Sequence, residues 1–123
     1  MSRVVFLAAL AMAAPAYADT RYFTELSDVP MPSSFAEINT VGFDNAQTRL
    51  VVADAAGAQN PTDVRSFYTE SLPALGWSQS PTTDGSLVFV RGRERLLLDV
   101  SEAGGRTHLH VQLVVRAPPP GGD

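Results

Sequence analysis

Three stretches in the C-terminal third of the chain alternate apolar and polar residues, and two short turn signals separate them. The stretches cover residues 86–91, 94–102 and 106–116, and the turn signals are Gly92-Arg93 and Gly104-Gly105. Alternation with period two predicts strands, and a two-residue connection that contains glycine predicts a tight hairpin. A slip of one residue would move every apolar side chain to the other face, so these turns constrain the fold more than any other feature.

The two turns set the register of an antiparallel meander. Tight turns at both places would pair Ala103 with Arg106, Val100 with Leu109, Leu98 with both Val111 and Leu87, and Leu96 with both Leu113 and Phe89. One continuous apolar face then forms across three strands, which is what a buried sheet face requires.

The segment "NPTDVRSFYTESLPALGW", residues 60–77, predicts a helix that covers this face. Asn60 is a favourable N-cap and Pro61 suits the first helical position. Val64, Phe67, Tyr68, Leu72 and Leu75 recur at steps of three and four residues and therefore share one helical side. Gly76 suits the left-handed position after a helix, with Trp77 folding back on Leu72, while Pro73 predicts a kinked last turn or an end at Leu72.

The remaining alternating stretches complete an α+β fold. Residues 35–43 and 49–57 predict a hairpin around Asp44-Asn45, and residues 77–82 predict the first strand of the meander. Asp84-Gly85 is a hairpin signal after this strand, but the stretch "SPTTDG" allows more than one loop. We therefore expect a β-hairpin, one helix packed on one face, and a four-stranded antiparallel meander, forming a single domain over residues 35–116.

The two ends of the chain are expected to lie outside this domain. Residues 1–18 have a basic start, an apolar run and an Ala-x-Ala ending, which predicts a secretory signal cleaved between Ala18 and Asp19. The apolar run is shorter than the ~20 residues that span a bilayer, so we expect a periplasmic or secreted protein with no membrane span after cleavage. Residues 19–34 predict an extended segment, and residues 117–123 a disordered Pro/Gly tail.

Composition argues against several classes of function. The net charge of −4 does not favour binding to nucleic acid, and the chain has no cysteine for disulfide or thiolate chemistry. No phosphate-binding loop or dinucleotide fingerprint is present, so no cofactor is expected. A Ser-His-Asp hydrolase would need Ser101 on a sharp turn beside oxyanion donors, whereas Ser101 is predicted within a strand. We therefore do not expect an enzyme.

The polar face of the meander offers a candidate metal site. The register places Asp99 opposite His110 and Ser101 opposite His108, so that both imidazoles and a carboxylate share one face. Two neutral imidazoles and a carboxylate are reasonable ligands for zinc or copper. The alternative is a solvated strand face that carries an Asp–His pair across two strands.

Two further groups are candidates for partner contact. "RGRER" is a basic hairpin tip in which Arg91, Arg93 and Arg95 could contact a phosphate or carboxylate, or could only increase solubility. Four aliphatic residues fall on the same face as the histidines: Val88, Val90, Leu97 and Val114. Either residues 19–34 cover these aliphatic side chains, or they form a partner surface.

Residues 28–100 resemble a recurring module of small exported bacterial proteins. The shared features are "VGFDNAQTRLVVADAAG" followed by a helix of the form V-x-x-F-Y-x-x-x-L-P-x-L-G-W, here Val64 to Trp77. The resemblance implies export and the packing of one helix on a sheet. It implies no catalytic residues, because that family has no assigned activity. We therefore expect a non-catalytic binding module of the bacterial cell envelope, whose partner is an envelope protein or ligand. The alternative is a small periplasmic ligand or metal carrier that uses His108, His110 and Asp99.

Overall fold

The computed structural model describes residues 21–118, so the expected signal peptide and most of the expected C-terminal tail lie outside the described residues. Its elements are β1 (Arg21–Tyr22), β2 (Pro30–Met31), β3 (Ala36–Asp44), β4 (Thr48–Gly57), α1 (Pro61–Ala74), β5 (Ser78–Ser80), β6 (Leu87–Arg91), β7 (Glu94–Ala103) and β8 (Arg106–Arg116). The predicted α+β class is confirmed.

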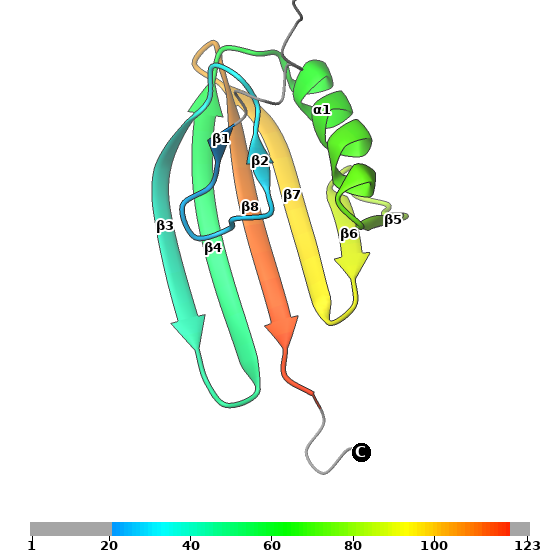
Figure 1. Cartoon of the computed structure of the whole chain (residues 1–123). Coiled ribbons are helices and arrows are strands. Elements are labelled where there is room, and N and C mark those ends of the chain that lie inside the picture. Colours follow the sequence, from blue (N-terminus) through cyan, green and yellow to red (C-terminus); the bar gives the residue numbers. More distant parts are fainter. Residues whose placement is uncertain (1–20, 119–123) are drawn as a thin grey trace, which may run out of the picture.

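One antiparallel sheet of six strands, in the order β3-β4-β8-β7-β6-β5, forms the body of the protein (Figure 1). The sequence predicted the hairpin β3–β4 and the meander β5–β8, but gave no order between them. The structure places β4 beside β8, with Val51 opposite Leu113 and Ala53 opposite Val111. Both units therefore contribute to the same two faces.

The predicted meander register is confirmed. Leu98 lies opposite both Val111 and Leu87, and Leu96 lies opposite both Leu113 and Phe89. Gly104 and Gly105 both have positive φ, as a type I′ turn requires, whereas Gly92 has positive φ at the first turn position, as in a type II′ turn. These turns match the right-handed twist of the strands and fix the pairing.

Among the loops that the stretch "SPTTDG" allows between β5 and β6, the tight turn signalled by Asp84-Gly85 does not form. Ser80 pairs with Val88, so residues 81–86 form a longer loop. Asp84 Oδ1 accepts hydrogen bonds from the Ser86 amide at 3.1 Å and hydroxyl at 2.6 Å. These bonds lower the pKa of the Asp84 carboxyl. The hydrogen bonds of the Asp84 side chain therefore determine the conformation of this loop. The dipeptide Asp84-Gly85 alone does not predict them.

Helix α1 begins and ends as its sequence predicts. The Asn60 side chain accepts a hydrogen bond from the Asp63 amide at 2.9 Å. At the other end, the Trp77 amide donates to the Leu72 carbonyl at 3.1 Å and the Gly76 amide to the Pro73 carbonyl at 3.1 Å, the two bonds of a Schellman closure. The helix nevertheless continues through Pro73 to Ala74, so an end at Leu72 is wrong. Pro73 has no amide hydrogen to donate to the Thr69 carbonyl, and because only Ala74 follows it in the helix, this loss is confined to the last turn.

The apolar side of α1 packs on the sheet as expected. Val64, Tyr68 and Leu72 are fully buried in one core together with sheet residues such as Leu98 and Val111. Phe67 is partly buried against this core. Leu75 was expected on the same side, but it is the C-cap and is exposed.

The N-terminal segment differs most from the prediction. Residues 21–34 were expected to run as an extended segment, yet β1 and β2 pair with each other and form a small two-stranded sheet. Phe23, Leu26, Val29 and Met31 enter the core that α1 also covers. The domain therefore begins before residue 35. We call residues 21–34 the N-terminal flap; it lies beside α1 on the same face of the large sheet (Figure 1).

A buried hydrogen bond joins the flap to the helix. The Tyr68 hydroxyl donates to the Pro30 carbonyl at 2.7 Å, and burial raises the pKa of this phenol well above its usual value. The start of β3 also packs closely, because a side chain at Gly57 would overlap the Phe35 ring. Together, flap and helix cover one side of the sheet completely enough to bury its central apolar residues.

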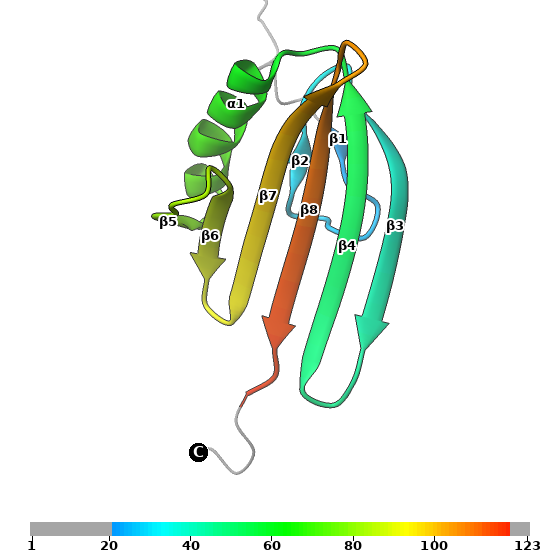
Figure 2. The same ribbon diagram turned by 180° about the vertical axis from the view of Figure 1, so that it is seen from behind.

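The opposite side of the sheet has no such cover in the described part of the chain. Figure 2 shows this side, with no helix or strand in front of β4, β8 and β7. Among residues 21–118, no helix is long and apolar enough to cross a membrane.

Candidate functional site

The uncovered side of the large sheet, here called the open face, is the main candidate for function. Antiparallel register places residues in rows across it, one row running Phe43, Leu50, Val114, Arg95 and Val90, and the next Val41, Val52, Gln112, Leu97 and Val88. Most of these side chains are apolar. Phe43 is 57% exposed and Val41 42% exposed, so this is an apolar surface in contact with solvent.

The other half of the open face is polar. The next row contains Asn39, Asp54, His110 and Asp99. Asp54 Oδ1 lies 2.8 Å from His110 Nδ1, and Asn39 Nδ2 donates to Asp54 Oδ2 at 3.4 Å. On the far side of the ring, His110 Nε2 lies 3.2 Å from Gln112 Nε2. With a proton on Nδ1, the imidazole donates to Asp54 and accepts from the Gln112 amide, so both of its nitrogens have a partner.

The predicted metal ligands share the open face but are not gathered into a ligand set. Asp99 lies opposite His110, and Ser101 lies opposite His108, as the register predicted. The carboxylate that contacts His110 is Asp54, on the other neighbouring strand, and within residues 21–118 no hydrogen bond joins Asp99 to the ring. Within residues 21–118, no group of three or more His, Cys, Asp or Glu side chains is placed to hold a metal ion.

The position of Asp54 could not be predicted without the neighbour of β8. The alternation of Leu50, Val52 and Asp54 along one strand was visible in the sequence, and it indicated that these three residues share a face. The alternation did not indicate that this face of β4 is continuous with the face of β8 that carries His110. Because the pairing of β4 with β8 could not be predicted, the sequence also did not show that Val41 and Phe43 of β3 belong to the open face.

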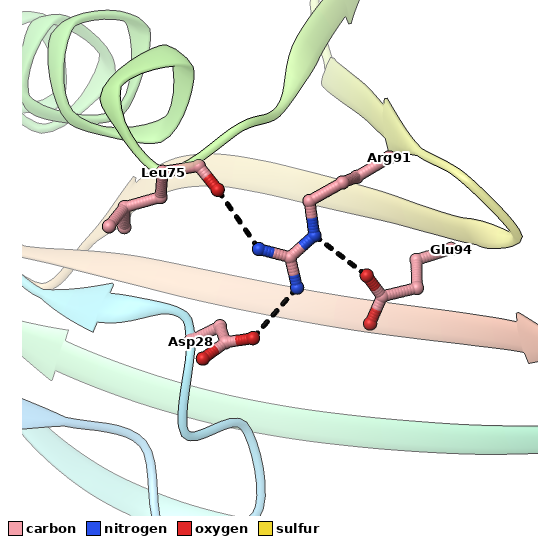
Figure 3. Close-up of polar contacts among 4 residues, drawn as sticks. All are labelled: Asp28, Leu75, Arg91 and Glu94. Carbon is pink, nitrogen blue, oxygen red and sulfur yellow. Dashed lines mark hydrogen bonds and ion pairs between the residues drawn. The ribbon is translucent and has the colours of Figure 1, made fainter.

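Arg91 was a predicted contact residue, but in the structure it joins three parts of the fold. Its guanidinium donates to Glu94 Oε1 at 2.8 Å, Asp28 Oδ2 at 2.7 Å and the Leu75 carbonyl at 3.0 Å (Figure 3). It also lies over the Trp77 ring, 4.4 Å from the centroid. The Glu94 hydrogen bond raises the pKa of Arg91. Arg91 is therefore committed within the protein and is not available to a ligand.

The other predicted contact residues divide between two places. Arg95 is exposed on the open face, between Val90 and Val114 in register. Arg93 lies at the β6–β7 turn, away from the aliphatic rows. Leu97 is partly exposed and Val90 is 37% exposed, but Val88 is only 4% exposed, so Val88 offers little surface to a partner.

The alternative role suggested for residues 19–34, covering the aliphatic side chains of the open face, is wrong for the described part of that segment. The flap packs on the opposite side, because Phe23, Leu26 and Val29 extend the core that α1 leaves unfilled over β4 and β8. A partner surface on the open face stays a prediction.

A separate hollow lies between α1 and the β5–β6 loop. It measures about 470 Å³ and is lined by Arg65, Gln79, Ser80, Pro81, Thr82, Gly85, Ser86 and Leu87. Its cation is already engaged, since Arg65 Nη1 donates to the Gly85 carbonyl at 2.7 Å. This hydrogen bond holds the loop to the helix.

Comparison with known proteins gives no match. No protein-family model matches the chain, and no curated protein or solved structure shows significant similarity to it. The resemblance to exported bacterial proteins therefore remains an expectation from the motif.

Proposed function

We propose that the chain is an exported, non-catalytic binding module of the cell envelope, and that the open face docks a different protein. The observation that carries the proposal is the apolar half of that face, where Phe43 is 57% and Val41 42% exposed, while the other face is packed. Export is supported by the signal pattern of residues 1–18. Large exposed apolar patches that are rimmed by polar residues are typical of protein interaction sites.

The polar half of the face indicates the chemistry of the partner. Asp99 is exposed beside the apolar rows, whereas Asp54 already holds His110 and Asn39. A partner that matches both halves carries an apolar strip with a lysine or arginine next to it. The strip would bury the aliphatic rows, and the cation would fix the orientation through Asp99.

The absence of catalysis is supported by the surroundings of the polar groups. Ser101 is paired within the β7–β8 ladder opposite His108, a position without the sharp strand-to-helix turn that exposes a catalytic serine beside oxyanion donors. Both nitrogens of His110 are engaged by Asp54 and Gln112. These arrangements suit a structured surface better than proton transfer to a substrate.

Site-specific crosslinking from the periplasm of the source organism tests the proposal. A photoreactive residue at Phe43 should give one defined product with a different protein, and the same residue at Ser66, on the exposed side of α1, should not give it. Phe43→Asp in a chain that carries the photoreactive group at Val41 should reduce this product about tenfold or more, since exposed aromatic anchors dominate interface energies. Ser66→Asp is the matched control for added charge.

Three results would contradict the proposal. One is a product at Phe43 that contains only a second copy of the chain, which would make the open face a self-association surface. Another is a product that Phe43→Asp and Ser66→Asp weaken equally. The third is the absence of any specific product at Phe43, with circular dichroism confirming that the labelled chain is folded.

A further inference from the structure

The large sheet has two edges of very different length. One edge is β5, with 3 residues, and the other is β3, with 9 residues. In both views of the fold, no helix or strand of residues 21–118 lies beyond β3 (Figures 1 and 2). A free edge carries backbone N–H and C=O groups that no strand pairs, so a long edge can accept a further strand.

The hydrogen bonds of the β3–β4 hairpin indicate which backbone groups point outward. The Asn45 amide donates to the Thr48 carbonyl at 3.0 Å. In an antiparallel ladder, pairs that exchange hydrogen bonds alternate with pairs that do not. Counting back from this pair in the observed register, every second residue of β3 therefore directs its N–H and C=O away from β4. The outward-directed residues are Thr40, Gly42 and Asp44.

The end of β3 lacks the features that commonly block an edge. Proteins protect edge strands with proline, lysine or a bulge, and β3 contains no proline, lysine or arginine. Its one irregularity is at Ile38, and the pairing is regular from Asn39 to Asp44. A Cβ at Gly42 would have no heavy atom within 4 Å, so the flap does not cover the backbone there.

The side chains of this edge define the strand that would match it. Val41 and Phe43 face the open side, so an added strand would place every second side chain beside these two apolar residues. Asp44 is exposed on the other side, and residues 21–118 provide no ion-pair partner for its carboxylate. A lysine or arginine opposite Asp44 would complement this charge.

The size of the edge favours a different protein over a second copy of the chain. A stable interface uses roughly 20–30 residues from each partner, far more than two copies of Asn39–Asp44 provide. Each copy also has a net charge of −4, so two copies repel each other. A protein that already covers the apolar half of the open face would add the edge to a larger contact.

We propose that this docked protein contributes an extended segment that pairs with Asn39–Asp44 and continues the large sheet beyond β3. The inference rests on the proposed docking to the open face and specifies how the partner binds. Backbone hydrogen bonds to the outward-directed residues align the segment. Its apolar side chains lie next to Val41 and Phe43, and its basic residue lies opposite Asp44.

Gly42→Pro and Gly42→Ala form a matched pair of variants at this edge. Proline removes the outward N–H and leaves the β3–β4 ladder intact, whereas alanine keeps the N–H and its methyl group enters open space. A photoreactive residue at Leu50, opposite Phe43 on β4, reports docking in the periplasm of the source organism without altering β3. Gly42→Pro should reduce the product with the different protein about tenfold or more. Gly42→Ala should change it by less than about twofold.

Amide hydrogen exchange tests strand addition without a variant. In the free chain, the amides of Thr40, Gly42 and Asp44 should exchange rapidly, while those of Val41 and Phe43 are protected by β4. In the purified cross-linked complex, all five amides should be protected. If circular dichroism shows that Gly42→Pro does not fold, this measurement decides the question alone.

The outcomes separate strand addition from docking. Strand addition is wrong, and docking stands, if folded Gly42→Pro and Gly42→Ala give equal amounts of product or if the outward amides stay unprotected in the complex. The absence of any product with a different protein at Leu50, in a folded chain, contradicts the proposed function and this inference together. A product that contains a second copy and that Gly42→Pro removes would show that β3 pairs with itself, which overturns the assignment of this edge to a different protein.

Discussion

Tyr68 shows how a single side chain connects two covering elements of the core. Its ring is fully buried on the apolar side of α1, and its hydroxyl donates a hydrogen bond to the Pro30 carbonyl of the flap at 2.7 Å. The periodic spacing of apolar residues predicted that Tyr68 faces the sheet. It could not predict the polar contact, because Pro30 lies in a segment whose apolar residues have no regular period.

The first prediction concerns this hydrogen bond. Tyr68→Phe keeps the ring but leaves a buried carbonyl without its donor, so the free energy of unfolding should fall by about 1–2 kcal/mol in urea. Phe67→Leu, at the partly buried neighbouring position, is the control, because it changes packing without removing a hydrogen bond. A Tyr68→Phe protein as stable as the wild type would show that the Pro30 carbonyl finds another donor.

The same residue should make stability depend on alkaline pH. The folded-state pKa of Tyr68 is raised, so its contribution is fully present below the pKa of an unfolded tyrosine, about 10. Above that pH the unfolded state loses the proton while the folded state keeps it. The free energy of unfolding should then fall by up to about 1.4 kcal/mol per pH unit. Urea titrations above pH 10 should show a smaller fall in Tyr68→Phe; equal slopes would contradict the assignment.

At the scale of elements, turn and periodicity signals predicted the pairing of strands that follow one another in the sequence. The flap and the pairing of β4 with β8 depend on long-range contacts and were not predicted. The turns at Gly92 and Gly104-Gly105 were sufficient to fix the meander register, because tight hairpins leave no freedom in pairing. The flap was missed because its apolar residues, Phe23, Leu26 and Val29, match no single period. The pairing of β4 with β8 was missed because no local signal links strands that are separated by a helix.

Arg91 is the clearest case in which a surface motif proves to be a structural connection. It joins the flap through Asp28, the end of α1 through Leu75 and the β6–β7 hairpin through Glu94. Arg91→Lys retains the charge but cannot make the three contacts and lie flat on Trp77 together. It should lower the free energy of unfolding by about 1 kcal/mol, a modest value because Asp28 is well exposed.

Arg95→Lys is the matched control for Arg91→Lys. Arg95 is exposed on the adjacent strand, and residues 21–118 contain no ion-pair partner for it. Its replacement should change stability by less than about 0.5 kcal/mol, as is usual at such surface positions. Equal effects of the two substitutions in urea unfolding would show that the contacts of Arg91 contribute nothing specific.

At the scale of the whole molecule, the large sheet has one side packed in the core and one side that no helix or strand of residues 21–118 covers. The candidate site was predicted in part: the shared face of His108, His110, Asp99 and Leu97 followed from the meander register. Its apolar half was underestimated, because Val41 and Phe43 come from β3, two strands away from β8.

The last prediction tests metal binding through the stability of the folded protein. A metal that binds only the folded state raises its stability by about 2.7 kcal/mol at a hundred times the dissociation constant, which increases the melting temperature. His110 is held by Asp54 and Gln112, and His108 lies opposite Ser101, so no ligand set is ready for zinc or copper. Titration with either metal should therefore leave the melting temperature unchanged.

An increase that saturates near one equivalent, and that both His108→Gln and His110→Gln remove, would instead support the metal carrier. His108→Gln by itself should not alter stability, whereas His110→Gln should lower it slightly through the loss of the Asp54 contact, so the two variants separate binding from structure.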